Sequence, residues 1–257
     1  MTQQARTLEM PLATAAPNFS LQPLRALRAL RKLIDNKEDT TQVFEIMRAL
    51  SGRATPLGYR RLLQTPEGGR QAYLREELSD RLNDPQWLAQ FAPGTVGAAY
   101  RAFIAPRNLS AYGLAEESRK LPDVNIDAAH PVAWYARRLR DIHDVWHVLT
   151  GYNTDALGEA CVVAFSYAQT RNFGFGFIAL AAMHQFEKLK RGQPYFKAIA
   201  QGYRRGKAAA WLPAEDYDAL FAEPLEAARK RLKITPAPIY DAIPQVDREP
   251  PYALAAS

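Results

Sequence analysis

The chain has 257 residues, of which 47% are hydrophobic and 23% are charged, the balance of an ordinary soluble globular protein. Its single cysteine, Cys161, excludes an internal disulfide and any metal site built from several thiolates of one chain, and it favours a reducing, cytoplasmic location. The formal net charge of +6 favours anionic partners, but no long basic arm and no basic–aromatic motif is present, so nucleic acid is not an expected partner.

The start of the chain and its apolar stretches predict no membrane-spanning segment. Residues 1–20 are polar, lack the apolar core of a signal peptide and are predicted to form a disordered lead. No uninterrupted apolar run reaches the roughly 18 residues that a transmembrane helix needs. The most apolar stretch, residues 174–183, is ended too early by His184 and Glu187.

The first predicted helix is amphipathic. Pro23 can open it, because a missing N–H group does no harm at the first helical position. Leucines such as Leu24 and Leu27 fall near one face, and basic residues occupy much of the rest. The helix is therefore a candidate for peripheral contact with an anionic membrane surface, on the inner face of the membrane, although a solvated basic face over a core stripe has the same pattern.

Helical periodicity continues along the chain, and alternating strand patterns are scarce. The predicted fold class is all-α, a single-domain bundle of roughly eight to ten helices. Helix start and stop signals place these helices at residues 23–34, 40–50, 70–83, 86–91, 97–103, 132–149, 155–171, 173–189, 195–210 and 214–230, the last of them interrupted at Pro224. A helical metal-binding domain is predicted over residues 21–232, and a proline-rich, extended C-terminal tail over residues 233–257.

The most informative segment contains His143, Asp144 and His147 and is followed by Glu159. Residues four apart share one face of a helix, so the two histidines project together and Asp144 can join the same side. A helix stop at residues 151–154 lets the chain reverse, so that a second helix can bring Glu159 opposite them. The four residues are predicted to bind one divalent metal ion. The alternative is a pair of histidines on a polar helix face without a ligand.

The ligand types narrow the metal and the chemistry. Imidazole and carboxylate ligands without a thiolate suit zinc, iron, manganese or cobalt, and zinc is expected first. Such a set leaves a coordination position open, so the same four residues are the predicted catalytic group. Three other classes of metalloprotein fit these residues less well. An HD-type phosphohydrolase would leave His147 and Glu159 without a role, and a zinc peptidase would have Glu in place of Asp144. A di-iron bundle would need two Glu-x-x-His motifs, which the sequence lacks.

The pattern His143-Asp144-x-x-His147, eleven residues and then Glu159 resembles the signature of the Coq-four family of ubiquinone (coenzyme Q) biosynthesis proteins. Two other stretches agree with it. Residues 24–50 resemble the N-terminal helices of that family, and residues 93–97 resemble its Pro-x-Thr-x-Gly segment, with Tyr100 and Phe103 following. The likeness covers about residues 21–232. The lack of a long mitochondrial-type presequence fits a bacterial member.

The resemblance implies an all-helical, often homodimeric protein with a metal at the four motif residues. The family acts on polyprenylated precursors of the quinone and is implicated in removing the ring carboxylate of a hydroxybenzoate and hydroxylating that carbon, which would make this chain a metal-dependent, oxidative decarboxylase. It is also implicated as a non-catalytic, prenyl-lipid-binding scaffold that organises other quinone-biosynthesis proteins. Residues 160–167 and 173–183 could hold a prenyl tail or form ordinary core. Arg137, Arg138 or Arg140 could pair with the substrate carboxylate or lie on a solvated face.

Overall fold

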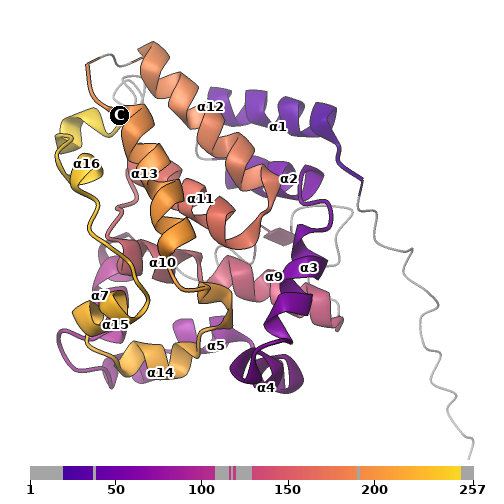
Figure 1. Cartoon of the computed structure of the whole chain (residues 1–257), viewed down its shortest axis with the longest axis vertical. Helices are drawn as coiled ribbons and strands as arrows, with labels where there is room; N and C mark the ends of the chain where they lie inside the picture. The colour runs from indigo at the N-terminus through magenta and orange to yellow at the C-terminus, as the bar shows by residue number, and fades with distance from the viewer. Residues whose placement is uncertain are drawn as a thin grey trace, which may run out of the picture.

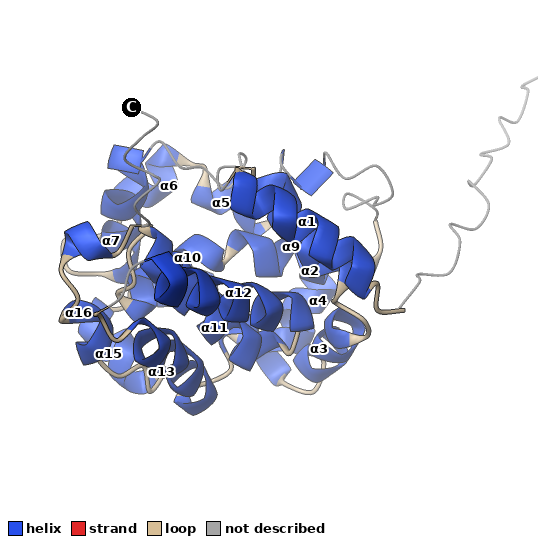
Figure 2. Ribbon diagram, turned by 90° about the horizontal axis from the view of Figure 1, so that it is seen from above, coloured by secondary structure: helices blue, strands red, loops and turns tan. Residues whose placement is uncertain are grey.

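The computed structural model describes residues 20–36, 39–107, 116, 118–119, 129–189 and 192–249. The regular secondary structure of these residues is helical, without a strand, which confirms the predicted all-α, single-domain bundle (Figures 1 and 2). No helix in the described part of the chain is long and apolar enough to cross a membrane. Residues 1–19 of the predicted lead over residues 1–20, and residues 250–257 of the predicted tail, lie outside the described residues.

The described α-helices are more numerous than the eight to ten predicted, because some predicted helices are divided and because the helices at Ala54–Leu62 and Pro238–Asp241 lie where none was predicted. Arg75 adopts a left-handed conformation that ends one helix within the predicted range 70–83. In chain order the helices are α1 (Pro23–Asp35), α2 (Thr40–Ala49), α3 (Ala54–Leu62), α4 (Pro66–Leu74), α5 (Leu78–Leu82), α6 (Pro85–Ala89), α7 (Val96–Ile104), α9 (Pro131–Asp141), α10 (His143–Thr150), α11 (Ala156–Thr170), α12 (Phe173–Leu189), α13 (Tyr195–Ala208), α14 (Tyr217–Ala222), α15 (Leu225–Arg231) and α16 (Pro238–Asp241).

The predicted helix over residues 132–149 also forms two helices, α9 and α10, which meet at Ile142. Ile142 is fully buried within a core cluster that also contains side chains of α7, α14 and α15. This joint leaves α10 as a short helix whose residues are nearly all buried. The histidines of the metal motif therefore lie on an element that the surrounding core holds in place.

The helix α11 runs through the middle of the molecule and is buried along most of its length (Figure 1). Its neighbour α13 approaches it very closely at two glycines. A Cβ atom at Gly202 would lie 2.5 Å from the carbonyl oxygen of Cys161, and one at Gly206 would lie 2.6 Å from that of Phe165. Only glycine fits at these positions, so the sequence Gly202-x-x-x-Gly206 sets the distance between the two helices.

We expect Gly202→Ala to destabilise the protein, because its methyl group would overlap the backbone of α11. Overpacking of this kind costs about 1–3 kcal/mol, enough to lower the thermal midpoint by several degrees. The matched control is Gly69→Ala in α4, where a Cβ would meet no atom within 4 Å and alanine is the better helix former. Equal midpoints for both variants in a thermal melt would contradict this account of the α11–α13 contact.

The segment after Lys233 is not the extended tail that its prolines predict. It forms α16, and Ile234, Ala237, Tyr240 and Ile243 are buried. The Tyr240 hydroxyl donates to Asp155 Oδ2 at 2.6 Å, at the start of α11. Prolines stop long helices, but the apolar residues between them supply enough burial to hold the segment against the bundle.

Candidate metal centre

Two helices bring the candidate ligands together. α10 presents His143 and His147 on one face, and α11 presents Glu159 in its first turn. The Nε2 atoms of the two histidines lie 3.3 Å apart. Oε2 of Glu159 lies 3.5 Å from Nε2 of His143 and 3.3 Å from Nε2 of His147. Three of the four predicted ligands thus meet in a small triangle of donor atoms.

The size of this triangle suits one metal ion. Zinc binds nitrogen and oxygen at about 2.0–2.2 Å, and a tetrahedral arrangement then separates neighbouring ligand atoms by about 3.4 Å. The three measured distances of 3.3, 3.3 and 3.5 Å agree with that spacing. The two imidazole Nε2 atoms face each other and the Glu159 carboxylate. Lone pairs that point at one another need a cation or a shared proton between them. The residues present therefore fit a divalent ion that keeps one position open.

The turn between α10 and α11 explains why Glu159 faces the histidines. Gly151 ends α10 with a φ of +76°, a left-handed conformation that favours glycine. Asp155 caps α11 by accepting the Gly158 N–H at 2.8 Å. A Cβ at Gly158 would lie 2.0 Å from the carbonyl oxygen of Asn153, so only glycine lets the chain fold back this tightly. The first turn of α11 is thereby held against α10.

His147 is the most constrained of the three residues, with a side chain that is 1% exposed. Its Nδ1 lies 3.0 Å from the carbonyl oxygen of Tyr152. A carbonyl can only accept, so Nδ1 carries the proton and donates it, which leaves the Nε2 lone pair directed at His143 and Glu159. The ring of Phe103 stacks on the other side, with centroids 5.5 Å apart. Sequence reasoning assigned no role to Tyr152, because it acts through its backbone.

The opposite side of the site is open. The side chain of His143 is 24% exposed and that of Glu159 is 41% exposed. A solvent molecule or a substrate oxygen can therefore approach the triangle from this side, while His147 and Phe103 close the inner side. An open outer position is the pattern of catalytic and not of structural metal sites.

The charges of the site favour a bound cation. Burial alone would lower the pKa of His147, but the negative charge of Glu159 and its hydrogen bond outweigh burial and raise it. For Glu159, burial would raise the pKa, but the charge of His147 and hydrogen bonds from both histidines hold it well below its usual range. Positive charge is thus stabilised between these side chains, where a metal ion would replace the proton.

Asp144, the fourth predicted ligand, is not part of the triangle. It is buried, at 7% exposure, and burial raises the pKa of its carboxyl, opposed by the two histidines. Its role as a ligand stays a prediction.

The three arginines considered for the substrate carboxylate all have other partners. Arg137 pairs with Glu77, and Arg140 pairs with Asp141. Arg138 is buried and donates to two backbone carbonyl groups. They therefore do not lie on a solvated helix face, and each guanidinium group is engaged within the protein.

The other two of the four histidines lie elsewhere. His184 and Glu187 are exposed on α12 and belong to no group of three candidate metal ligands among the described residues. His130 caps α9, accepting the Val132 N–H at 3.2 Å. At Gly174 the backbone of α2 packs closely against α12, since a Cβ there would lie 2.6 Å from Met47 Cα.

Comparison with known proteins assigns the family. The sequence profile described as "Coenzyme Q (ubiquinone) biosynthesis protein Coq4" matches residues 24–238, most of the chain. The chain belongs to this family. Similar proteins include two mitochondrial ubiquinone biosynthesis protein COQ4 homologs. That of Nematostella vectensis is 28% identical, over 69% of this chain and 83% of its own length. That of Xenopus laevis is 27% identical, over 67% of this chain and 58% of its own length.

The human homolog of this name is 25% identical over 68% of this chain and 63% of its own length. Family membership places the chain in ubiquinone biosynthesis. The fold also matches a crystal structure of a Nostoc punctiforme protein provisionally assigned to ubiquinone biosynthesis, with a TM-score of 0.60 and 24% identity over 84% of this chain and all of that one. At that identity the likeness shows the fold alone.

Proposed function

We propose that this protein binds one divalent metal ion through His143, His147 and Glu159, with Asp144 as a fourth ligand, and decarboxylates a polyprenylated hydroxybenzoate precursor of ubiquinone. Zinc is the ion expected first, and iron and manganese suit the same ligands. The observation that carries the proposal is the triangle of donor atoms, with the spacing of a metal face and one open side. Family membership supports the pathway and favours it over an HD-type phosphohydrolase.

Decarboxylation releases carbon dioxide and leaves an electron pair on the ring carbon. A proton then replaces the carboxylate. In the oxidative alternative the ring carbon passes its electron pair to dioxygen, which takes up two protons and leaves as hydrogen peroxide, and water supplies the hydroxyl group that replaces the carboxylate. The bound ion would supply Lewis-acid stabilisation of the developing negative charge. His147, fixed by the Tyr152 carbonyl, keeps its Nε2 in place, and Phe103 gives the inner wall an apolar face. The exposed sides of His143 and Glu159 border the position where a ring oxygen can enter.

The direct test is elemental analysis of the purified protein together with mass spectrometry of the lipids that purify with it. About one equivalent of a transition metal and a prenylated ring compound would support the proposal. Protein that stays metal-free when dialysed against zinc, iron or manganese would contradict the metal centre.

A second candidate function is a prenyl-lipid-binding scaffold that holds other quinone-biosynthesis proteins together, as a homodimer, with a structural metal. One observation favours it: Arg137, Arg138 and Arg140 are all engaged within the protein, so they offer no cation to a substrate carboxylate. Bound lipid without turnover would distinguish this scaffold from the enzyme.

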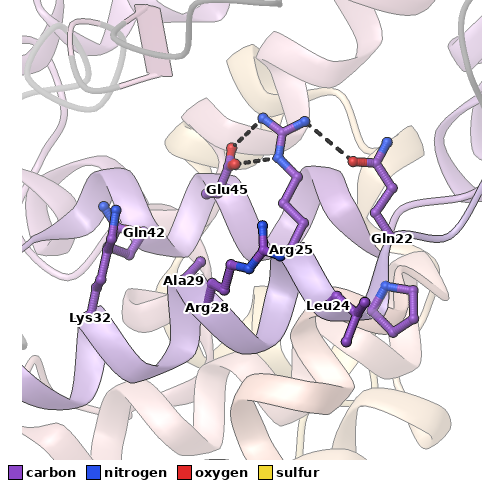
Figure 3. A pocket seen from close by; sticks show the side chains of 9 residues that line it. Gln22, Leu24, Arg25, Arg28, Ala29, Lys32, Gln42 and Glu45 are labelled. Carbon is purple, nitrogen blue, oxygen red and sulfur yellow. Dashed lines mark hydrogen bonds and ion pairs between the residues drawn. The ribbon is translucent and has the colours of Figure 1, made fainter.

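The proposed peripheral membrane contact uses α1. Its buried alanines pack against α2, and its outer face exposes Leu24, which is 69% exposed, beside Arg28, Arg31 and Lys32. Figure 3 shows Arg28 and Lys32 along the groove between α1 and α2, whereas Arg25 is turned to Glu45 and Gln22. Exposed leucine beside basic residues suits the surface of an anionic bilayer.

We expect the triple variant Arg28→Glu, Arg31→Glu, Lys32→Glu to lose binding to anionic vesicles, because each basic residue near such a surface contributes about 1 kcal/mol. Sedimentation with phosphatidylserine-containing vesicles measures it. The control makes the same change of net charge on α13 and α15, at Arg204, Lys207 and Lys230, and should keep most binding. Equal loss in both variants would show that net charge alone is responsible.

A further inference from the structure

The C-terminal end of the metal-motif helix has an unusual set of donors. The last four carbonyl groups of α10 are all satisfied. The Gly151 N–H donates to the first at 2.9 Å. Arg229 of α15 donates to the next two through Nε and Nη2, at 2.9 Å each. Arg205 of α13 donates through Nη2 to the last, the carbonyl of Thr150, at 2.8 Å. Two cations thus stabilise the negative end of the helix dipole.

Arg205 also holds the turn that follows α10. Its guanidinium group lies over the ring of Tyr152, 4.7 Å from the centroid, and its Nε donates to the carbonyl of Thr235 at 2.8 Å. The carbonyl of the same Tyr152 accepts the Nδ1–H of His147. Arg205 therefore fixes both the backbone before this carbonyl, at Thr150, and the side chain of the residue that carries it.

The surroundings of Arg205 indicate a positioning role. It is only 5% exposed, it forms no ion pair with a carboxylate in the described part of the chain, and its Nη1 has no acceptor there. A buried cation bonded only to carbonyl groups is costly, so packing alone would favour an apolar residue. On either side of Arg205, Gly202 and Gly206 let α13 pack closely against α11, the helix that carries Glu159. Arg205 therefore connects α13, which packs on the Glu159 helix, to the turn whose carbonyl orients His147.

We propose that Arg205 is a positioning residue of the metal centre: it holds the Thr150–Tyr152 turn so that the Tyr152 carbonyl fixes the ring of His147 and directs its Nε2 at His143 and Glu159. Arg229 caps the same helix but has no bond to that turn. The inference rests on the proposed metal site, and it separates helix capping, which both arginines provide, from ligand orientation, which only Arg205 provides.

The test measures Co²⁺ affinity by competition with a chromophoric chelator, and the visible absorption spectrum of the bound Co²⁺. Outer partners of metal ligands typically contribute about 10–100-fold in affinity. We expect Arg205→Gln to weaken Co²⁺ binding about tenfold and to shift the spectrum, because His147 is free to rotate. Arg205→Lys keeps one donor and should recover part of both. Arg229→Gln, the matched control, should lower the thermal midpoint and leave the spectrum unchanged.

Unchanged affinity and spectrum in folded Arg205→Gln would overturn the proposal, and so would equal losses in Arg205→Gln and Arg229→Gln. If Arg205→Gln does not fold, Arg205→Lys decides, and wild-type affinity in that variant overturns the proposal. Wild-type protein that binds no Co²⁺ and no zinc would refute the metal centre and this inference together. Wild-type protein that binds metal without turnover refutes only the decarboxylase, because affinity and spectrum do not depend on activity.

Discussion

Replacing His147 by alanine is expected to remove most of the bound metal. The variant loses the one ligand whose ring is held on both sides, by the Tyr152 carbonyl and by Phe103. Even residues behind a metal ligand contribute about 10–100-fold to affinity, so loss of the ligand itself should cost more than about a hundredfold. Elemental analysis after gel filtration, compared with wild-type protein purified in parallel, measures the result.

Because His147 is buried, its loss also leaves a small cavity and an unpaired carbonyl, at an expected cost of about 1–3 kcal/mol in stability. His143→Ala separates the two effects, since the His143 side chain is 24% exposed and its removal should spare the fold. His184→Ala on the exposed face of α12 is the control for losing a histidine as such. Full occupancy in both His147→Ala and His143→Ala would refute the assignment of the site.

The parts of the fold that sequence could predict are those governed by local rules. The spacing of His143 and His147 places them on one helix face, and Gly151 predicts the reversal that brings Glu159 opposite. Proline and glycine stops located most helices, because these residues act on the backbone directly. The all-α class followed from the same periodicity.

Features that depend on contacts between distant segments could not be predicted. The burial of Tyr240 against the start of α11 outweighs the prolines around it, and no local pattern shows this. The orienting carbonyl of Tyr152 has no side-chain signature. Arg138 and Arg205 look like solvated helix residues in the sequence, yet both are buried on backbone carbonyl groups supplied by distant segments. The close contact between α11 and α13 does have a signal in the sequence, the spacing of Gly202 and Gly206, since glycines four apart on a helix permit the close approach of a neighbouring helix.

The largest functional effect is expected for Glu159→Gln in a cell that depends on this protein for ubiquinone. Glutamine keeps the size and one oxygen of the side chain but removes the negative charge that draws a cation to His143 and His147. Because the Glu159 side chain is 41% exposed, the change should cost little stability. We expect quinone production to be abolished while the protein level stays normal, as measured by lipid extraction, mass spectrometry and immunoblotting.

The compound that accumulates tests the chemistry. If the protein is the decarboxylase, Glu159→Gln cells should accumulate a prenylated ring precursor that still carries its carboxylate, and Glu187→Gln cells, with the same change on the exposed face of α12, should not. A scaffold behaves differently, because its loss depletes several intermediates at once, while a folded variant that still binds its partners keeps working. Normal quinone levels in cells with folded Glu159→Gln protein would therefore exclude metal-dependent catalysis at this site and leave the scaffold as its function.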